Sequence, residues 1–451
     1  MARTMTVDSK PIRLTQFSHG GGCGCKIAPG LLQEILARAP QGIVPPELLV
    51  GTETSDDAAV YRLNDSQALV ATTDFFTPIV DDPYDFGRIA ATNALSDIYA
   101  MGGTPIMALA LVGMPIAQLP PEVIGRVLEG GADVCREAGI PIAGGHSIDV
   151  LEPIYGLVGL GLVHPQRVRR NADAQAGDVL VLGKPLGVGI LSAALKKGIL
   201  DAAGYADMLR YTTQLNRVGI ALGALEGVHA MTDVTGFGLA GHLLEVCRGS
   251  GLSARVNLAQ VPFIEAAAKF ALDGVVTGAS ARNWAAYGAD VAWAPGAPEW
   301  QRHLLTDPQT SGGLLVSCSP DALQQVLEAV GVSRVGPREG EFGEAPRPLK
   351  VGHGLQIAEI RLGGGVQRRD DLVATAFQLL RVLHDAHQQA AAAGGGVLQL
   401  VDVGVQVAQT GGDAALGLAG RHPLLAQRGE RVVLGALGGN ARSVHQIGRA
   451  S

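Results

Sequence analysis

The sequence predicts a mixed fold of the α/β or α+β class. Segments with the apolar pattern of strands are interspersed with segments whose apolar residues follow helical spacing. Of the 451 residues, 47% are hydrophobic and 17% are charged, which is typical of a globular protein with a large core. Because one domain rarely holds this many residues, we expect two or three structural units.

The first unit mixes strands and helices. Its helices are predicted at residues 31–37, 84–101 and 122–138, and its strands at residues 58–63, 68–73, 106–112, 141–143 and 154–163. Pro29 and Pro40 flank the first helix, as expected for residues that begin or end helices. The fourth strand is expected to stop at Gly144 and Gly145.

A change in composition near residues 172–178 predicts the start of a second unit, with strands at 179–183 and 314–317. The predicted division is a mobile N-terminal segment (1–50), an N-terminal domain (51–170), a C-terminal α+β domain (171–340) and a tail (341–451). The tail contains no Tyr, Trp, Met or Cys, and its only aromatic residues are Phe342 and Phe377. Since it has little with which to fill a core, we expect an atypical, low-complexity tail that is largely disordered.

Composition also argues against several classes of protein. The formal net charge of −7 argues against a nucleic-acid binder or a protein that binds anionic membranes. No apolar run reaches the roughly 18 residues of a membrane helix, and the N-terminus lacks the apolar region of a secretory signal. Five cysteines in so long a chain do not form a disulfide framework, so we predict reduced thiols and a cytoplasmic location.

Residues 20–26, Gly-Gly-Gly-Cys-Gly-Cys-Lys, are the most informative stretch of the chain. They place the thiols of Cys23 and Cys25 and the ammonium of Lys26 within four positions, on a backbone too rich in glycine to form a packed element. A nearby cation lowers the pKa of a thiol and favours the nucleophilic thiolate. The stretch therefore predicts a mobile reactive loop. The alternative is a flexible arm with an incidental thiol pair or a partial metal site.

Polar residues at strand ends and on one helix face are candidate ligands of a metal. Asp57 precedes a strand, Asp74 and Asp233 end strands, and Asn93 and Asp97 lie four positions apart on one helix. Oxygen ligands of this kind suit Mg²⁺, which proteins hold through a few carboxylates together with substrate phosphates. A single Asp at a strand end is more often part of a turn or a cap. The prediction of a magnesium–nucleotide site therefore depends on their clustering.

Three glycine-rich stretches, at residues 143–147, 233–242 and 310–313, are predicted to be loops that could bind phosphate. The second has the pattern of strand, tight turn and helix, which aims backbone N–H groups at an anion. None matches the P-loop or the dinucleotide fingerprint, and an ordinary turn is the alternative for each. For His146 and His242, which lie in these stretches, capping or packing is at least as good an interpretation as catalysis.

Several blocks of sequence carry a resemblance to a known family. The stretch at 18–27 is followed in order by blocks at residues 56–60, 72–76, 91–103, 143–147, 231–238 and 307–313. Together they resemble the selenophosphate synthetases, also called selenide, water dikinases, over about residues 11 to 335. The resemblance implies a two-domain fold of the aminoimidazole-ribonucleotide-synthetase type, in which N-terminal strands form a homodimer interface.

The resemblance also implies an activity. The reaction converts ATP, selenide and water into selenophosphate, AMP and phosphate, and selenophosphate is the selenium donor for selenocysteine and selenouridine synthesis. Mg²⁺ is the implied cofactor, with K⁺ and a selenium-delivery protein as further candidates.

Residue by residue, Cys23 and Lys26 match the family's catalytic pair, and Cys25 matches a second cysteine of less certain need. The metal-binding aspartates match Asp57, Asp74, Asp97 and Asp233. The nucleotide contacts match Lys26, Asp74, Asn93, Asp97, Gly144, Gly145, His146 and Ser147.

The chain departs from the family near its end. The family closes soon after its last strand, near residues 335–350 here, and that strand is not evident in residues 332–339. Two alternatives stay open. Another ATP-dependent enzyme of the superfamily would keep the aspartates but has no use for Cys23, Cys25 and Lys26. A non-catalytic thiol–metal binding protein would use Cys23, Cys25 and His19, one ligand short of a closed zinc site.

Overall fold

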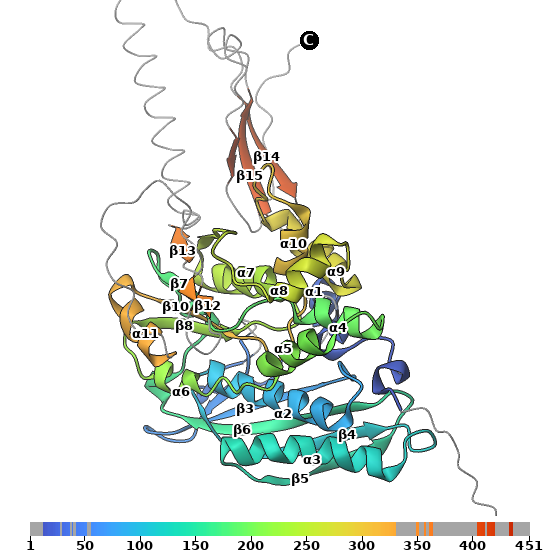
Figure 1. Cartoon of the computed structure of the whole chain (residues 1–451). Coiled ribbons are helices and arrows are strands. Elements are labelled where there is room, and N and C mark those ends of the chain that lie inside the picture. The colour runs from blue at the N-terminus through green and yellow to red at the C-terminus, as the bar shows by residue number, and fades with distance from the viewer. Residues whose placement is uncertain are drawn as a thin grey trace, which may run out of the picture. The chain divides into compact units, whose positions relative to one another are not determined.

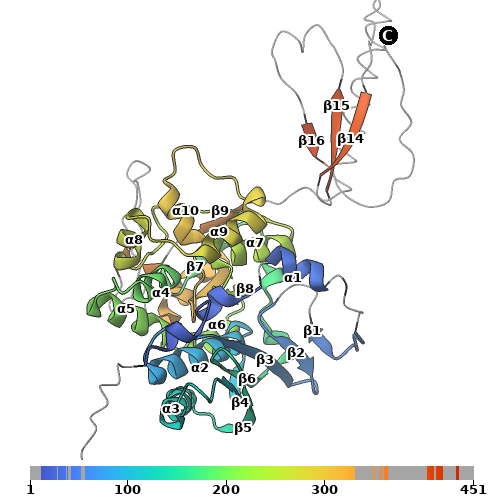
Figure 2. The same cartoon turned by 90° about the vertical axis from the view of Figure 1, so that its right-hand side faces the viewer.

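A computed structural model of the chain (Figures 1 and 2) describes residues 12–27, 29–36, 38, 42–51 and 56–330. It also describes strands at residues 349–350, 356–357, 360–363, 404–410, 413–419 and 433–435. The chain divides into two units, residues 1–365 and 366–451. The disorder predicted for the tail falls largely on residues outside the described ones. Of the described helices, none is long and apolar enough to cross a membrane.

A six-stranded sheet organises the N-terminal half, in the order β1-β2-β3-β6-β4-β5. Its strands are β1 (Leu48–Val50), β2 (Ala59–Arg62), β3 (Ala68–Phe76), β4 (Thr104–Met114), β5 (Ile142–Asp149) and β6 (Ile154–Val163). Neighbours are antiparallel except β4 and β5, which are parallel and joined by a helix. Buried residues alternate with less buried ones along β3, so one face of the sheet packs against helices.

Two helices, α2 (Pro83–Ala100) and α3 (Pro121–Ala138), cover that face (Figure 1). The side chain of Asp82 caps α2 by accepting a hydrogen bond from the N–H of Asp85 at 2.9 Å. Residues 89–100 are all buried, because α2 is covered by the sheet, by α3 and by parts of the C-terminal half.

Glycines let these two helices approach closely. A Cβ atom on Gly87 would lie 1.9 Å from the carbonyl oxygen of Val127, and one on Gly130 would lie 2.0 Å from that of Tyr84. Any side chain at these positions would push the helices apart. The close packing holds α2 firmly against the sheet, and α2 carries two of the predicted site residues.

A five-stranded antiparallel sheet organises the C-terminal half, in the order β8-β10-β7-β13-β9. Its strands are β7 (Val179–Leu182), β8 (Val228–Asp233), β9 (Ser253–Arg255), β10 (Leu314–Cys318) and β13 (Ile360–Gly363). The helices of this half are α4 (Val188–Lys196), α5 (Ala202–Thr212), α6 (Val218–Gly223), α7 (Gly238–Ser250), α8 (Glu265–Leu272), α9 (Gly278–Tyr287), α10 (Glu299–Leu305) and α11 (Leu323–Ala329). The N-terminal segment contributes α1 (Pro29–Leu36).

Strand β13 comes from the part of the chain predicted to be tail. It pairs with β7 on one side and β9 on the other, so residues 360–363 join the C-terminal sheet. The short strands β11 (Leu349–Lys350) and β12 (Gln356–Ile357) pair with each other. In the second unit, β14 (Gly404–Thr410), β15 (Asp413–Ala419) and β16 (Val433–Gly435) form an antiparallel sheet.

The mixed α/β class predicted from the sequence is confirmed, and most predicted elements are within a few residues of those observed. One prediction is wrong. Gly144 and Gly145 do not end a strand but lie inside β5, which continues to Asp149. The reason is parallel pairing with β4, which places Gly145 opposite Ala110 and Ser147 opposite Val112.

Candidate active site

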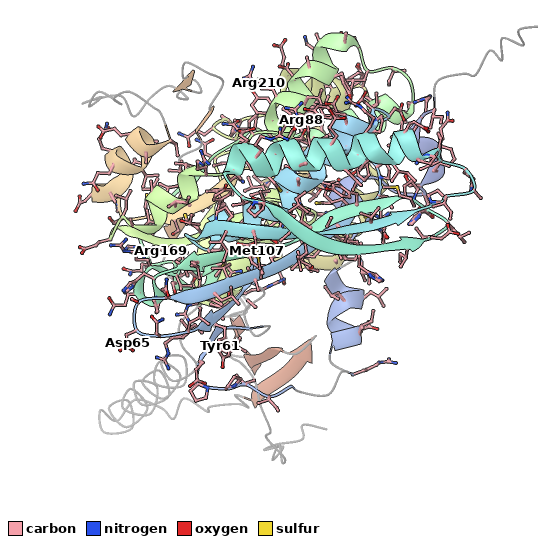
Figure 3. The ribbon with its side chains drawn as sticks, turned by 90° about the horizontal axis from the view of Figure 1, so that it is seen from below. Tyr61, Asp65, Arg88, Met107, Arg169 and Arg210 are labelled. Atoms are coloured by element: carbon pink, nitrogen blue, oxygen red, sulfur yellow. The ribbon has the colours of Figure 1, made fainter. Side chains whose placement is uncertain are left out.

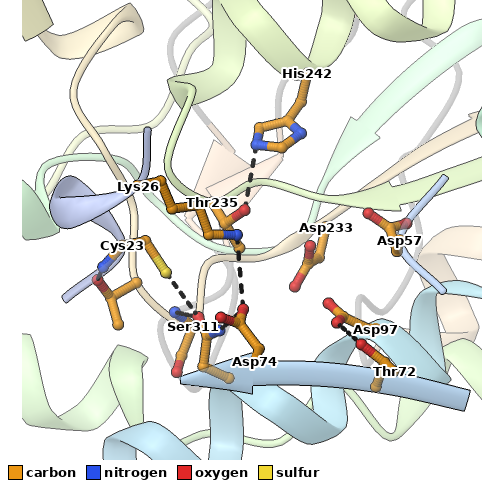
Figure 4. Close-up of polar contacts among 12 residues, drawn as sticks. Cys23, Lys26, Asp57, Thr72, Asp74, Asp97, Asp233, Thr235, His242 and Ser311 are labelled. Carbon is orange, nitrogen blue, oxygen red and sulfur yellow. Dashed lines mark hydrogen bonds and ion pairs between the residues drawn. The ribbon is translucent and has the colours of Figure 1, made fainter. Parts of the chain in front are cut away.

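The candidate site lies where the end of β3, the middle of α2, the end of β8 and the N-terminal loop meet (Figure 4). The loop forms a short 3-10 helix, η2 (Gly22–Cys25), and the loop before β10 covers it. Gly22 has a φ of 54° and a Cβ there would lie 2.4 Å from Oγ1 of Thr310, so only glycine fits this turn.

Cys23 is tied to both halves of the molecule. Its backbone N–H donates to Oγ1 of Thr310 at 3.0 Å, and its thiol donates to Oδ1 of Asn93 at 3.3 Å. The side chain is 1% exposed. The loop is therefore packed in this arrangement, unlike the unpacked loop predicted from its glycine content.

The protonation of Cys23 also differs from the prediction. Burial raises the pKa of the thiol well above its ordinary value, and this outweighs Lys26, which acts to lower it. Asp74 raises the thiol pKa further. The expected lowering by Lys26 is real but is the smaller effect, so Cys23 is a neutral thiol in this arrangement.

Lys26 follows η2 and points its ammonium into the site. Its Nζ lies 3.6 Å from Oδ2 of Asp74, and its side chain is 38% exposed (Figure 4). Burial acts to lower the pKa of Lys26, but Asp74, Cys23 and Asp97 act in the opposite direction and the pKa is raised. Lys26 therefore stays a cation, available to an anionic ligand.

Asn93, on α2, connects the loop to the carboxylates. Its Nδ2 donates to Oδ2 of Asp74 at 2.6 Å, while its Oδ1 accepts from the backbone N–H of Ser311 at 2.7 Å as well as from Cys23. Asn93 is fully buried. Because all these contacts converge on one amide, Asn93 links α2 to the N-terminal loop, to β3 and to the loop before β10.

Three further carboxylates, those of Asp57, Asp97 and Asp233, lie beside this group (Figure 4). Asp97 accepts a hydrogen bond from the hydroxyl of Thr72, and Asp57 accepts one from that of Thr232 at 2.9 Å. Oδ2 of Asp57 and Oδ2 of Asp233 are buried without a hydrogen-bond partner among the described residues. A buried unpaired carboxylate oxygen is costly and indicates a missing positive ligand.

The electrostatics of these carboxylates support the same conclusion. Burial raises the pKa of all three, and Asp233 raises those of Asp57 and Asp97 further because like charges repel. Within the described part of the chain, no three His, Cys, Asp or Glu side chains are close enough to hold one ion by themselves. Mg²⁺ usually takes one or two carboxylates together with substrate phosphates and water, so the residues fit Mg²⁺ that arrives with a nucleotide.

The structure does not bring Gly144, Gly145, His146 and Ser147 to this group. All four lie on exposed β5 at the edge of the sheet, three strands away from β3. At about 4.8 Å per strand the separation is roughly 14 Å. The phosphate-binding loop predicted at 143–147 is therefore wrong as secondary structure, since these residues are part of a strand.

Thr310 and Ser311 are site residues whose roles the sequence did not reveal. Thr310 holds the N–H of Cys23, and Ser311 contacts Asn93 while its backbone adopts a φ of 50°, unusual for a residue other than glycine. They lie 287 and 218 residues from their partners. His19, which borders η2, is exposed and pairs with Glu152 at 2.8 Å rather than with a thiol.

The chain matches two family models. The AIR synthase related protein, N-terminal domain, matches residues 55–163, and the AIR synthase related protein, C-terminal domain, matches residues 175–338. Among solved structures, tt0281 from Thermus thermophilus has a TM-score of 0.54 and 18% sequence identity, covering 74% of this chain and 94% of that one. The two halves and the site between them thus define an AIR-synthase-related protein.

Relatives of higher sequence identity show which family of AIR-synthase-related proteins the chain belongs to. The selenide, water dikinase of Burkholderia ambifaria (strain MC40-6) is 69% identical over 351 residues, which are 77% of this chain and 99% of the relative. That of Pseudomonas straminea is 66% identical over 326 residues, 72% of this chain and 91% of the relative. The chain belongs to the selenide, water dikinase family. These matches cover nearly all of each relative but leave about a quarter of this chain outside, in line with the predicted departure.

Proposed function

We propose that this chain synthesises selenophosphate from ATP, selenide and water and releases AMP and phosphate. The observation that carries the proposal is the contact chain from the thiol of Cys23 through Asn93 to Asp74 and the ammonium of Lys26. This contact chain brings together a thiol, a cation and a carboxylate of the kind that binds Mg²⁺. The family assignment supports the same activity.

Lys26 and the N-terminal loop position the phosphates of ATP for transfer. A cation aimed at the phosphates opposes the charge that spreads over their oxygens during phosphoryl transfer, which depends mainly on positioning and charge. The contacts of η2 with Thr310 and Asn93 exclude water from the thiol. Selenide rather than water then takes the γ-phosphoryl group.

Mg²⁺ is part of the proposal. Asp57, Asp74, Asp97 and Asp233 are the residues that would hold it, and the ion would neutralise charge on the phosphates of ATP. The unpartnered oxygens of Asp57 and Asp233 support this assignment. The nucleotide contacts predicted for Gly144, Gly145, His146 and Ser147 require one of two arrangements. Either β5 contacts the base of the nucleotide, or the β5 of a second copy of the chain makes the contacts.

The two alternatives make less use of the observed contacts. A kinase or a synthetase of the superfamily needs the carboxylates but gives no function to a buried thiol bonded to Asn93. A thiol–metal binding protein needs Cys23, Cys25 and His19 together, and His19 is bonded to Glu152 instead.

The proposal is tested by anaerobic ³¹P NMR of the purified chain with ATP, Mg²⁺, K⁺ and selenide under reducing conditions. We expect a selenophosphate resonance, with AMP and phosphate forming in step. ADP as the end product without selenophosphate would favour the kinase-type alternative. Intact ATP together with tight Zn²⁺ binding would favour the thiol–metal binding protein.

The homodimer is proposed on the open face of the six-stranded sheet. Strand register places a set of partly buried or exposed apolar side chains on the face away from α2: Tyr61, Leu69, Ala71, Phe75, Met107, Leu109, Val158, Leu160 and Leu162. Tyr61 is 40% exposed and Phe75 47% exposed, and Figure 3 labels Tyr61 and Met107. A contiguous apolar face of this kind suits association with a second copy.

Replacing Tyr61 with aspartate is expected to convert the dimer to a monomer, since the change puts a charge on the apolar face proposed as the interface. Light scattering coupled to size-exclusion chromatography measures the mass. The matched control is Leu272→Asp, at an exposed apolar residue of the C-terminal half that is 61% exposed. A Tyr61 variant that stays dimeric while the control behaves like wild type would place the interface elsewhere.

The cytoplasmic location remains a prediction from the cysteine content, and the use of K⁺ and the selenium-delivery protein remain predictions from the family resemblance. The negative net charge of −7 is in keeping with the prediction that nucleic acid is not a partner.

A further inference from the structure

A buried lysine of the C-terminal half contacts the loop before β10. Lys184 follows β7 by two residues and is 3% exposed. Its Nζ donates hydrogen bonds to the backbone carbonyl of Gln214 at 2.6 Å and to that of Ser311 at 2.8 Å. Because Ser311 is one of the residues that contact Asn93, Lys184 is linked to the candidate site through Ser311.

Packing alone does not account for a lysine at this position. Both of its hydrogen-bond acceptors are backbone carbonyls, which carry only a partial negative charge. Burial lowers the pKa of Lys184 to about 7, even though Asp233 acts to raise it. Either form of the amine keeps the two N–H groups that these bonds use. An apolar side chain would fill the same space without the cost of burying an amine, so the two hydrogen bonds are what this lysine adds.

Ser311 has a backbone conformation that needs support. Its φ of 50° lies in the left-handed region, which residues other than glycine rarely adopt. Three hydrogen bonds hold it there. Its N–H donates to Oδ1 of Asn93 at 2.7 Å, its hydroxyl donates to the carbonyl of Ile89 at 3.0 Å, and its own carbonyl accepts from Lys184. Since strain persists only where surrounding contacts enforce it, Lys184 is one of the groups that keep Ser311 in this conformation.

The N-terminal loop depends on the same short segment (Figure 4). Thr310 directly precedes Ser311, and its Oγ1 accepts the backbone N–H of Cys23 at 3.0 Å. The thiol of Cys23 donates to Asn93, whose Oδ1 also accepts the N–H of Ser311. A change in the backbone of Ser311 would therefore disturb both contacts that hold Cys23.

The residue after Ser311 is fixed independently of Lys184. The carbonyl of Gly312 accepts a hydrogen bond from Nδ2 of Asn216 at 2.8 Å, and the same nitrogen donates to Oγ of Ser96 on α2 at 2.8 Å. Loss of the lysine should thus have a local effect, because the loop before β10 stays attached to α2 through Asn216.

We infer that Lys184 is a positioning residue that keeps the N-terminal loop packed over the candidate site, an inference that rests on the proposed function for its effect on turnover. Lys184 fixes the peptide that follows Ser311, and the conformation of Ser311 directs its N–H to Asn93. Without the lysine, Ser311 returns to an ordinary φ, its N–H turns away from Asn93, and the loop that carries Cys23 opens more often. Lys184 acts through Ser311 and is not itself a catalytic residue.

The test compares variants in a Cys25→Ser background, in which Cys23 is the thiol left in the loop and the other cysteines are buried. Lys184→Met keeps an unbranched side chain and removes both hydrogen bonds. Lys184→Arg keeps the donors, and a cavity of about 110 Å³ beside Lys184 leaves room for the larger head group. The matched control is Leu222→Ala, because Leu222 is buried and lines the same cavity with an apolar side chain.

The rate at which iodoacetamide alkylates Cys23 without nucleotide measures how often the loop opens. We expect Lys184→Met to raise this rate by about 10-fold or more, the effect of one lost hydrogen bond of a charged group on a local opening. Its kcat for selenophosphate should fall by about 10-fold, while its Kd for Mg²⁺·ATP, which depends on the carboxylates, should change less. Lys184→Arg should restore both the alkylation rate and kcat. Leu222→Ala should lower the melting temperature and leave the alkylation rate unchanged.

Two results would overturn the inference. A wild-type alkylation rate in Lys184→Met would mean that the lysine does not hold the loop, and an equal rise in Leu222→Ala would assign the effect to general loss of stability. If thermal unfolding shows that Lys184→Met does not fold, Lys184→Gln decides the matter. Its amide reaches less far than the ammonium, so the alkylation rate should again rise, and a wild-type rate would refute the inference.

The alkylation rate also separates this inference from the proposed function. A wild-type chain that makes no selenophosphate would refute the proposed function, whatever the alkylation rates of the variants. An active Lys184→Met variant with an unchanged alkylation rate would refute the role of the lysine alone.

Discussion

Replacing Cys23 with serine is expected to lower selenide-dependent turnover by at least ~10²-fold while leaving the affinity for Mg²⁺·ATP near that of the wild type. The hydroxyl of serine is close in size to the thiol and can make the same hydrogen bond to Asn93. The hydrogen bond to Thr310 is donated by the backbone N–H of residue 23, so the substitution retains it. The substitution therefore removes the sulfur chemistry and keeps the closed loop. Turnover is measured by ³¹P NMR and binding by calorimetry.

Cys25 provides the matched control for this change. It lies in the same turn, two positions away, but is less buried than Cys23. We expect Cys25→Ser to reduce turnover far less. Normal selenide-dependent turnover in the Cys23 variant would remove the thiol from the mechanism. A loss of Mg²⁺·ATP binding in that variant would mean that the thiol supports the fold of the site rather than the chemistry.

Replacing Asp57 with asparagine is expected to weaken Mg²⁺·ATP binding by about 10-fold or more and to stabilise the protein when no metal is present. The physical reason is the same for both effects. Asp57 has a buried carboxylate oxygen and lies near Asp97 and Asp233, whose charges repel its own, and a bound cation relieves that repulsion. In EDTA the melting temperature should rise, by about 2–4 °C for each kcal/mol recovered. Calorimetric titration and thermal unfolding measure the two effects.

The control for this variant is Asp56→Asn, which changes the net charge equally. Asp56 accepts the backbone N–H of Asn171 at 2.7 Å, a contact outside the carboxylate group. We expect its Mg²⁺·ATP affinity to stay near that of the wild type. Unchanged affinity in the Asp57 variant would take Asp57 off the set of metal ligands.

The same carboxylates predict a pH dependence of the metal-free protein. Burial raises the folded-state pKa of Asp57, Asp97 and Asp233 above the unfolded value of about 3.9. Between the unfolded and folded pKa values the folded state therefore binds more protons, so the free energy of unfolding falls as pH rises through this window. Thermal unfolding in EDTA at a series of pH values should show this fall, and Asp57→Asn should reduce it. A free energy of unfolding that rises with pH there would contradict the proposed crowding of charge.

Local chemistry determined much of what the sequence revealed. Cys23 and Lys26 in their glycine-rich stretch, and the aspartates at the ends of β3 and β8, are informative in isolation because their residue types restrict the chemistry. The apolar periodicity identified most strands and helices because each element must bury one face. Strand β13 was missed because its pairing with β7 and β9 comes from a part of the chain with a weak local signal.

Contacts between distant residues were decided by the tertiary structure. The sequence cannot indicate that Thr310 holds Cys23 or that Asn93 joins the thiol to Asp74, because these partners meet only when the two halves pack together. The same packing reversed the expected effect on the thiol. Proximity of Lys26 in the sequence predicted a lowered pKa, but burial, which depends on the whole fold, is the larger effect and raises it. Residue types therefore indicated the chemistry of this protein, whereas its fold decided which groups are charged, buried and in contact.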